Sequence, residues 1–314
     1  MVQGIVSERS GFRIDGAPTE RPSRSQAIES LRIASAFGIV AFHARAPLPD
    51  LTYAGLVIFL TLSPMMDTLF NWERVRSVKN LADRLLAPWA FWSLAYALFN
   101  FVSHKPLLPT PEPVGGILMG TSQHLWFLPF VFAVLFALNA FKQVVGPAVL
   151  FWCGVAISAA MLASVDFWRP VSLNWALPLP QWVHAAPAVF IGIAIGLAGR
   201  VGRSAAFGGP IVAAGLAVAA MTKSPGLSVT YPVGVAATAI VVLAGRKWLP
   251  ANWSAQPVAD CMLGVYLIHI LPLSIVSRVT GEGTYVTVIV TFLISLGAVW
   301  AARRVAPMSK LVLG

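Results

Sequence analysis

The first apolar run of the chain, at residues 31–47, reads LRIASAFGIVAFHARAP. Apart from Arg32, His43 and Arg45, it consists almost entirely of apolar and small side chains. About 20 such residues cross a bilayer as an α-helix. A strand of a membrane β-barrel would alternate apolar and polar side chains, which this run does not. The run therefore predicts a transmembrane helix.

Similar runs recur along the whole chain. Ten of them are candidate spans: 29–47, 51–70, 82–103, 124–141, 145–164, 183–199, 205–221, 229–245, 257–277 and 284–302. Of the 314 residues, 57% are hydrophobic and 11% are charged, against about 25% charged in an average soluble domain. This composition excludes an ordinary cytosolic globule, a disordered chain and a disulfide-stapled secreted domain. It predicts an all-α integral membrane protein with about ten transmembrane helices.

The 22 basic residues indicate how these spans are oriented. If the N-terminus is cytoplasmic, seventeen Lys and Arg lie in inner segments, and the outer segments hold Arg45, Lys105, Arg169, Lys223 and Arg278. This asymmetry favours cytoplasmic positions for both termini. We expect a polar cytoplasmic tail at 1–28, a membrane domain at 29–302 and a short cytoplasmic tail at 303–314. The net charge of +10 is spread over the loops, so it does not indicate nucleic-acid binding.

Other sequence features add little chemistry. The two cysteines, Cys153 and Cys261, lie in separate apolar runs and are expected to be buried thiols, and no metal-binding motif such as CxxC or HExxH is present. The first 27 residues lack the central apolar stretch of a signal peptide. Six tryptophans cluster at the ends of runs, as in interfacial belts: Trp126, Trp168, Trp175, Trp182, Trp248 and Trp253.

The polar residues of the first run are the most informative. Arg32 and His43 are eleven residues apart, so on a helix they share a face about 16 Å apart along the axis. Between them, Ala34, Ser35, Ala36 and Gly38 would allow close helix packing. An imidazole near the middle of the membrane can act as a general base. Equally, His43 could simply form hydrogen bonds to a neighbouring helix. Arg32 could bind an anion, or its side chain could simply extend to the membrane surface at the end of the helix.

Three further clusters carry polar groups. Arg74, Arg76, Lys79 and Arg84 crowd one inner loop, which fits phosphate binding or the positive-inside rule alone. His124 opens a span beside Trp126, and Tyr266 and His269 are three residues apart on one helical face. These residues fit either a site or contacts between helices. Asp67, inside an apolar run, needs a cationic partner, Arg or His, while His104 and His184 are expected in outer loops.

Several sequence elements follow one another in a fixed order: Arg32 with His43, IFLTLS ending at Ser63, Arg74-Val-Arg76, Arg84 to Pro88, HLWFL at 124–128 and LGVYLIH at 263–269. In this order they resemble the signature of membrane acyltransferase family 3. These are integral O-acyltransferases that modify bacterial surface polysaccharides. One departure is Ser63-Pro64-Met65, where the family commonly has Ser-Gly-aromatic, so the proline would stiffen the expected turn next to Ser63.

The resemblance implies a multi-pass enzyme of the bacterial cytoplasmic (inner) membrane. It would transfer an acyl group, most simply acetyl, from cytoplasmic acetyl-CoA to a hydroxyl of an exopolysaccharide or other surface glycan, without a metal. The resemblance implies that His43 is the general base. The thioester carbonyl would be polarised, or His43 oriented, by Tyr266 and His269. CoA would be bound by Arg32, Arg74, Arg76 and Arg84, and the substrate by His124, Trp126 and Ser63. An alternative mechanism makes His43 a covalent acyl carrier. Two alternative functions are a non-catalytic transporter or carrier of a glycan or lipid-linked sugar, and a sensor domain.

Overall fold

The computed structural model describes residues 25–244, 254–306 and 309–313, and the regular structure in these ranges is entirely helical. Residues 1–24 of the predicted tail lie outside the described residues. So do four other residues that the sequence analysis used, Arg246, Lys247, Trp248 and Trp253. The predicted all-α class is confirmed for the described part of the chain.

The helices follow the predicted apolar runs closely. In chain order they are α1 (Gln26–His43), α2 (Pro49–Phe70), α3 (Val78–Val102), α4 (Pro113–Met119), the 3-10 helix η1 (Gln123–Trp126), α5 (Phe127–Val144), α6 (Pro147–Ala163), α7 (Val165–Ser172), α8 (Leu179–Val201), the 3-10 helix η2 (Gly202–Ser204), α9 (Ala205–Met221), α10 (Thr230–Ala244), α11 (Gln256–Ala259), α12 (Met262–Ile268), α13 (Ile270–Thr280), α14 (Tyr285–Val305) and α15 (Ser309–Leu313). Each of the ten predicted spans overlaps at least one of these helices.

Fewer stretches are long and apolar enough to cross a membrane by themselves. Five in the described residues are: Pro49–Phe70, Val78–Val102, Gln123–Val144, Leu179–Met221 and Tyr285–Val305. Two bent pairs raise the number to seven if each is one span, namely α6 with α7, bent by 78°, and α11–α12 with α13, bent by 75°. The structure thus has five to seven candidate spans. The shortfall from ten arises partly at α1, which carries Glu29 and Arg32 near its start, and at the short α10.

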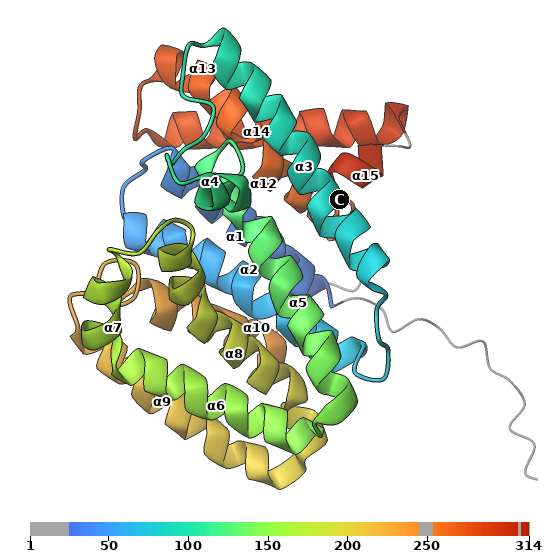
Figure 1. Cartoon of the computed structure of the whole chain (residues 1–314), viewed down its shortest axis with the longest axis vertical. Helices are drawn as coiled ribbons and strands as arrows, with labels where there is room; N and C mark the ends of the chain where they lie inside the picture. Colours follow the sequence, from blue (N-terminus) through green and yellow to red (C-terminus); the bar gives the residue numbers. More distant parts are fainter. Residues whose placement is uncertain (1–24, 245–253, 307–308, 314) are drawn as a thin grey trace, which may run out of the picture.

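Helices α1 and α2 form the centre of the bundle, near the middle of Figure 1. Their backbones approach closely, because a Cβ added at Gly38 of α1 would lie 2.8 Å from the carbonyl oxygen of Thr52, and one added at Gly55 of α2 would overlap the Ser35 carbonyl. The predicted close packing at the small residues of α1 is therefore confirmed. Around this pair, α2 also contacts α8 and α10, whereas α12 and α14 contact α1.

Prolines end or interrupt helices at three places that also carry a histidine. The three sequences are HARAP at 43–47, HLWFLP at 124–129 and HILP at 269–272. A proline lacks the N–H that would bond the carbonyl four residues earlier and collides with it. Accordingly, α1 ends at His43, four residues before Pro47, and α12 ends at Ile268, four residues before Pro272. The 3-10 turn η1 likewise precedes Pro129, which lies in the first turn of α5.

The structure corrects six local expectations. Cys153 is exposed on α6 and is not a buried thiol. His184 is buried on α8 and does not lie in a loop. His43 is the last residue of α1 and does not lie within a longer span. Ser63 and Pro64 lie inside α2, so the turn expected there is absent. Tyr266 and His269 are separated by the break between α12 and α13 and do not share one continuous helix. Trp126 is only 7% exposed, so it packs inside the bundle and is not an interfacial residue.

Candidate active site

Three histidines from distant parts of the sequence meet at one place. The ring centroids of His43 and His269 are 4.9 Å apart, those of His124 and His269 are 5.2 Å apart, and those of His43 and His124 are 6.1 Å apart. They lie at the end of α1, in η1 and at the break between α12 and α13. The sequence identified each of them separately, and the helix breaks bring them together.

The hydrogen bonds assign the protons of His43 and His269. Nδ1 of His269 lies 2.7 Å from the carbonyl oxygen of Tyr266, which can only accept, so this Nδ1 carries a proton. In neutral His269, Nε2 is then an acceptor. Nδ1 of His43 faces two acceptors, the Ile39 carbonyl at 3.0 Å and this Nε2 at 3.1 Å, and so carries a proton too. The lone pair of neutral His43 is therefore on Nε2, and no described residue hydrogen-bonds to that atom.

His124 is fixed by a separate set of hydrogen bonds. Its Nδ1 lies 3.0 Å from Oγ of Ser122, and its Nε2 lies 3.2 Å from the carbonyl oxygen of Leu267. The hydroxyl of Tyr96 donates to the same Leu267 carbonyl at 2.8 Å, and the hydroxyl of Tyr266 donates to the carbonyl of His124. The Leu267 carbonyl lies in the last turn of α12, and the His124 carbonyl lies in the 3-10 turn η1. The network ties η1 to the break after α12.

A cavity of about 170 Å³ lies beside the histidines. Its lining residues are Ile39, Phe42, His43, Tyr53, Leu56, Gln123, His124, Trp126, Gln181 and Tyr266. His269 is fully buried and does not line the cavity, so it supports His43 from behind. The imidazole of His43 thus faces a space where a substrate can bind.

The cavity confirms some predicted neighbours and adds others. His124, Trp126 and Tyr266 line it together with His43, whereas Ser63 does not. The polar side chains of Tyr53, Gln123 and Gln181 also line it, and the sequence analysis missed all three. Gln123 directly precedes His124, so the quoted HLWFL element pointed to its neighbourhood. Tyr53 and Gln181 belong to no motif, and only the packing of α2 and α8 brings them to this wall.

The ring nitrogens of the three histidines are mostly engaged with other groups of the described structure. In the described ranges, no group of three His, Cys, Asp or Glu side chains is arranged to hold a metal ion. Five of the six ring nitrogens already have hydrogen-bond partners in the described residues, and the sixth is Nε2 of His43.

A second cluster surrounds the buried carboxylate of Asp67 near the end of α2. Nζ of Lys142 lies 2.8 Å from one carboxylate oxygen, and a guanidinium nitrogen of Arg76 lies 3.2 Å from the other. The side chains of Asp67 and Lys142 are only 2% and 1% exposed. The expectation that Asp67 requires a cationic partner is confirmed. Because two cations face one carboxylate, the cluster keeps a positive charge.

Helix α5 fixes the loop that carries Arg74 and Arg76. Nζ of Lys142 also donates to the carbonyls of Asn71 at 3.1 Å and Arg74 at 3.3 Å, and Nδ2 of Asn139 donates to the carbonyl of Arg76 at 3.2 Å. The loop at 71–77 therefore has a defined backbone between α2 and α3. The side chain of Arg74 is exposed and forms no ion pair with another described residue. Its guanidinium is available to an anion.

The other predicted anion-binding residues lie apart from this loop. The guanidinium of Arg32 is 2.6 Å from the carboxylate of Glu29, so its charge is already paired on α1. Arg84 is exposed on α3, and it directly follows Asp83, which pairs with Lys79. The structure thus joins Arg74 and Arg76 in one cluster and does not add Arg32 to it.

The cluster around Asp67 and the cavity beside His43 are two separate places, and α2 contributes residues to both. Leu56 at the cavity and Asp67 at the cluster are eleven residues apart on α2, which corresponds to about 16 Å along the helix. None of Asp67, Arg74, Arg76 and Lys142 lines the cavity. Only a long, thin molecule can contact both places at once.

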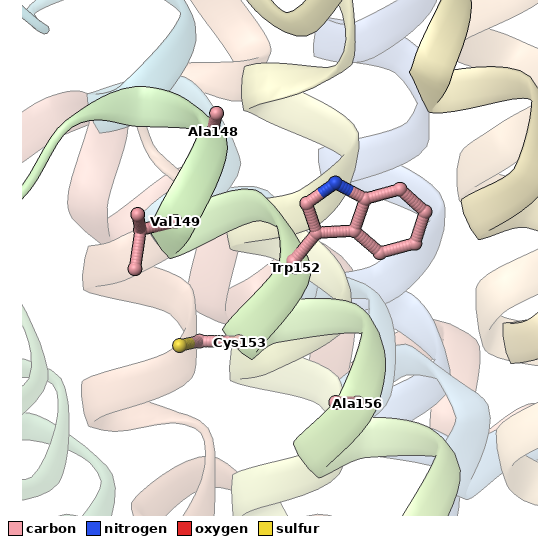
Figure 2. Close-up of a pocket in the computed structure, with 5 residues that line it drawn as sticks. All are labelled: Ala148, Val149, Trp152, Cys153 and Ala156. Carbon is pink, nitrogen blue, oxygen red and sulfur yellow. The ribbon is translucent and has the colours of Figure 1, made fainter.

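A second hollow, of about 430 Å³, has a different character (Figure 2). Its lining residues, Ala148, Val149, Trp152, Cys153 and Ala156, all come from α6. Such a surface on one apolar helix lacks the converging polar groups of a binding site. We regard it as part of the apolar outer face of the bundle.

No protein-family model, no curated protein and no solved structure matches this chain. Function is therefore inferred from the chemistry of these two places and from the resemblance in the sequence.

Proposed function

We propose that this protein is an integral-membrane O-acyltransferase that resembles acyltransferase family 3. It transfers an acetyl group from cytoplasmic acetyl-CoA to a hydroxyl of an exopolysaccharide or another surface glycan in the bacterial inner membrane. The proposal includes ten spans with both termini in the cytoplasm. Its support is the sequence resemblance, the asymmetry of basic residues and the two polar places in the bundle.

The single observation that carries the proposal is the free Nε2 of His43. A general base needs a lone pair that faces the substrate and a ring that is held in one orientation. The Ile39 carbonyl and His269 hold Nδ1, and the ring lines the cavity. This arrangement has the logic of a catalytic triad, in which a third group orients the base. A histidine whose role was only to connect helices would be expected between them, away from a cavity.

The loop at 71–77 supplies the place for the donor. CoA carries phosphates on its nucleotide end, and arginine forks suit phosphate oxygens. Arg74 forms no ion pair with another described residue, and Arg76 lies in a cluster whose charge is only partly compensated by Asp67. The thin pantetheine arm would pass between the helices from this loop to the cavity, which matches the separation of about 16 Å along α2.

The proposed reaction uses His43 twice. The acceptor hydroxyl oxygen attacks the thioester carbonyl carbon while its proton passes to Nε2 of His43. The tetrahedral intermediate then expels the CoA sulfur, which takes the proton from His43 and leaves as the free thiol. The products are the acetyl ester and CoA, and His43 returns to its neutral form. His269 and Tyr266 are positioning residues here, since the hydroxyl of Tyr266 is already bonded to the carbonyl of His124.

The test is acetyl transfer by the purified protein in nanodiscs. Radiolabelled acetyl-CoA is supplied with glycan from cells that express the protein, after mild base has removed its esters. We expect protein-dependent CoA release and a base-labile acetyl ester on the glycan. Glycan that binds and crosses a membrane without CoA release would instead indicate the transporter alternative, and the enzymatic proposal would be wrong.

A further inference from the structure

Arg200 is a basic residue that the proposed function does not use. It lies in the last turn of α8, and its guanidinium contacts the loop at 71–77, which is the proposed place for the donor. Its Nη1 lies 3.4 Å from a carboxylate oxygen of Glu73, although 127 residues separate the two in the sequence. Its guanidinium carbon lies 5.9 Å from the ring centre of Trp72. The structure thus brings a further arginine to this loop.

The packing of α8 on α2 fixes this contact. The two helices lie side by side (Figure 1). A Cβ added at Gly196 of α8 would lie 2.6 Å from the carbonyl oxygen of Met65 on α2 and would overlap the hydroxyl of Thr68. One helical turn further along the chain, Arg200 follows Gly196, and Trp72 follows Thr68 just past the end of α2. The close contact of the two backbones therefore places Arg200 next to Trp72.

The two neighbours of Arg200 have different roles. Trp72 is partly buried and packs against the hydrophobic core, so its ring is a firm support, and the face of an indole attracts a cation within about 6 Å. The side chain of Glu73 is 80% exposed and that of Arg200 is 36% exposed. An ion pair this exposed is weak, because water solvates both charges. Trp72 therefore orients the guanidinium, whereas a more highly charged anion can displace Glu73.

The charges around the loop at 71–77 do not cancel. Four cations and two carboxylates leave a net charge of +2 on the side chains of Arg74, Arg76, Lys142, Arg200, Asp67 and Glu73. Asp67 and Lys142 are buried, so the exposed part of this charge lies mainly on Arg74 and Arg200. A phosphate monoester carries about two negative charges at pH 7, and the planar fork of arginine matches its oxygens. The surface thus fits a phosphate group.

We propose that Arg200, oriented by Trp72, binds a phosphate of the nucleotide end of CoA together with Arg74. On binding, the phosphate replaces Glu73 as the partner of Arg200. The identity of the ligand rests on the proposed function, but CoA binding does not require acyl transfer, so the two are tested apart. A lipid headgroup of the inner leaflet offers the same phosphate chemistry and is the competing source.

The experiment is equilibrium binding of radiolabelled CoA to the full chain in phosphatidylcholine nanodiscs, with no acceptor present. We expect Arg200→Gln to raise the Kd about tenfold, because a charge-assisted hydrogen bond is lost. Trp72→Leu should raise it about two- to fivefold, since the guanidinium loses its support. Glu73→Gln should lower it about two- to fivefold, because the competing carboxylate is gone. Arg278→Gln is the matched control and must not change it, since Arg278 is also an exposed arginine in the last turn of a helix, α13.

The opposite signs separate ligand binding from folding, because Arg200→Gln and Glu73→Gln break the same ion pair. The proposal is overturned if both variants shift the Kd in the same direction, or if Arg200→Gln binds CoA as tightly as the wild type. It is also overturned if Arg200→Gln loses only co-purified phosphatidylglycerol, which would assign the site to a lipid headgroup. If Arg200→Gln does not fold, Arg200→Lys makes the same test, since it keeps the charge and removes the fork. A wild type that binds CoA but transfers no acetyl group would contradict the acyltransferase proposal and leave this one standing.

Discussion

Nδ1 of His43 lies 3.1 Å from Nε2 of His269, although 226 residues separate them in the sequence. The contact joins the end of α1 to the break between α12 and α13, two places where a following proline stops the helix. It also decides the proton positions, because the protonated Nδ1 of His269 leaves Nε2 as the acceptor. As a consequence, the lone pair of neutral His43 lies on Nε2, and His43 is one of the residues that line the cavity. Five predictions follow from this arrangement and from the packing around it.

Replacing His43 with asparagine should lower the rate of acetyl transfer by about 10²–10⁴-fold, the usual contribution of a general base. The amide has the size to pack but cannot take the proton. The rate is measured as labelled acetyl ester formed on the glycan. His104→Asn is the matched control, because His104 is exposed and its φ of 54° suits asparagine. Normal transfer by His43→Asn would contradict the assignment of the base.

Replacing His269 with phenylalanine should lower kcat by about 10²-fold through misorientation of His43, with the KM for acetyl-CoA unchanged. The oxygen of a glutamine can accept the same hydrogen bond from Nδ1 of His43. His269→Gln should therefore recover much of the lost kcat. Steady-state kinetics of the two variants make the comparison. Equal losses in both would show that His269 acts by packing alone.

The double change Arg74→Gln with Arg76→Gln should weaken CoA binding by about 10- to 100-fold, since it removes two charge-assisted hydrogen bonds. Equilibrium binding of labelled CoA to nanodiscs gives the Kd directly. Lys79→Gln is the control, because Lys79 pairs with Asp83 on the exposed side of α3, 2.6 Å away. Unchanged affinity in the double variant would remove the donor site from this loop.

Replacing Lys142 with methionine should destabilise the protein by about 3 kcal/mol, because it removes a buried partner of Asp67. The additional change Asp67→Leu should recover part of the loss, since no buried carboxylate then remains. Thermal unfolding in a mild detergent gives both values. A double variant that is less stable than Lys142→Met alone would show that the ion pair contributes less than the shape of Asp67.

Replacing Gly55 with alanine should cost about 1–3 kcal/mol, because its Cβ would overlap the carbonyl oxygen of Ser35 on α1. Gly297→Ala on α14 is the matched control. Nothing lies within 4 Å of a Cβ at Gly297, and alanine favours the helix by up to about 1 kcal/mol there. The melting temperatures should therefore shift in opposite directions. A tolerated alanine at Gly55 would mean that α1 and α2 can separate.

Much of the fold could be predicted from local sequence. The apolar runs predicted helices at all ten places, because side-chain hydrophobicity and the need to pair backbone groups act locally. The small residues of α1 predicted its close contact with α2. Lengths were less certain, since Pro47 and Pro272 end or break helices within apolar runs. A proline four residues downstream was the available signal for both sites.

By itself, the sequence determined the helical class, the apolar stretches, the buried charge of Asp67 and the individual histidines at positions 43, 124 and 269. Each of these follows from the chemistry of neighbouring residues. Only the tertiary structure decided that His269 supports His43, that Lys142 is the buried partner of Asp67 and that His184 stacks on Tyr53. Such pairings join residues far apart in the chain, and their distances depend on how helices cross and where they break.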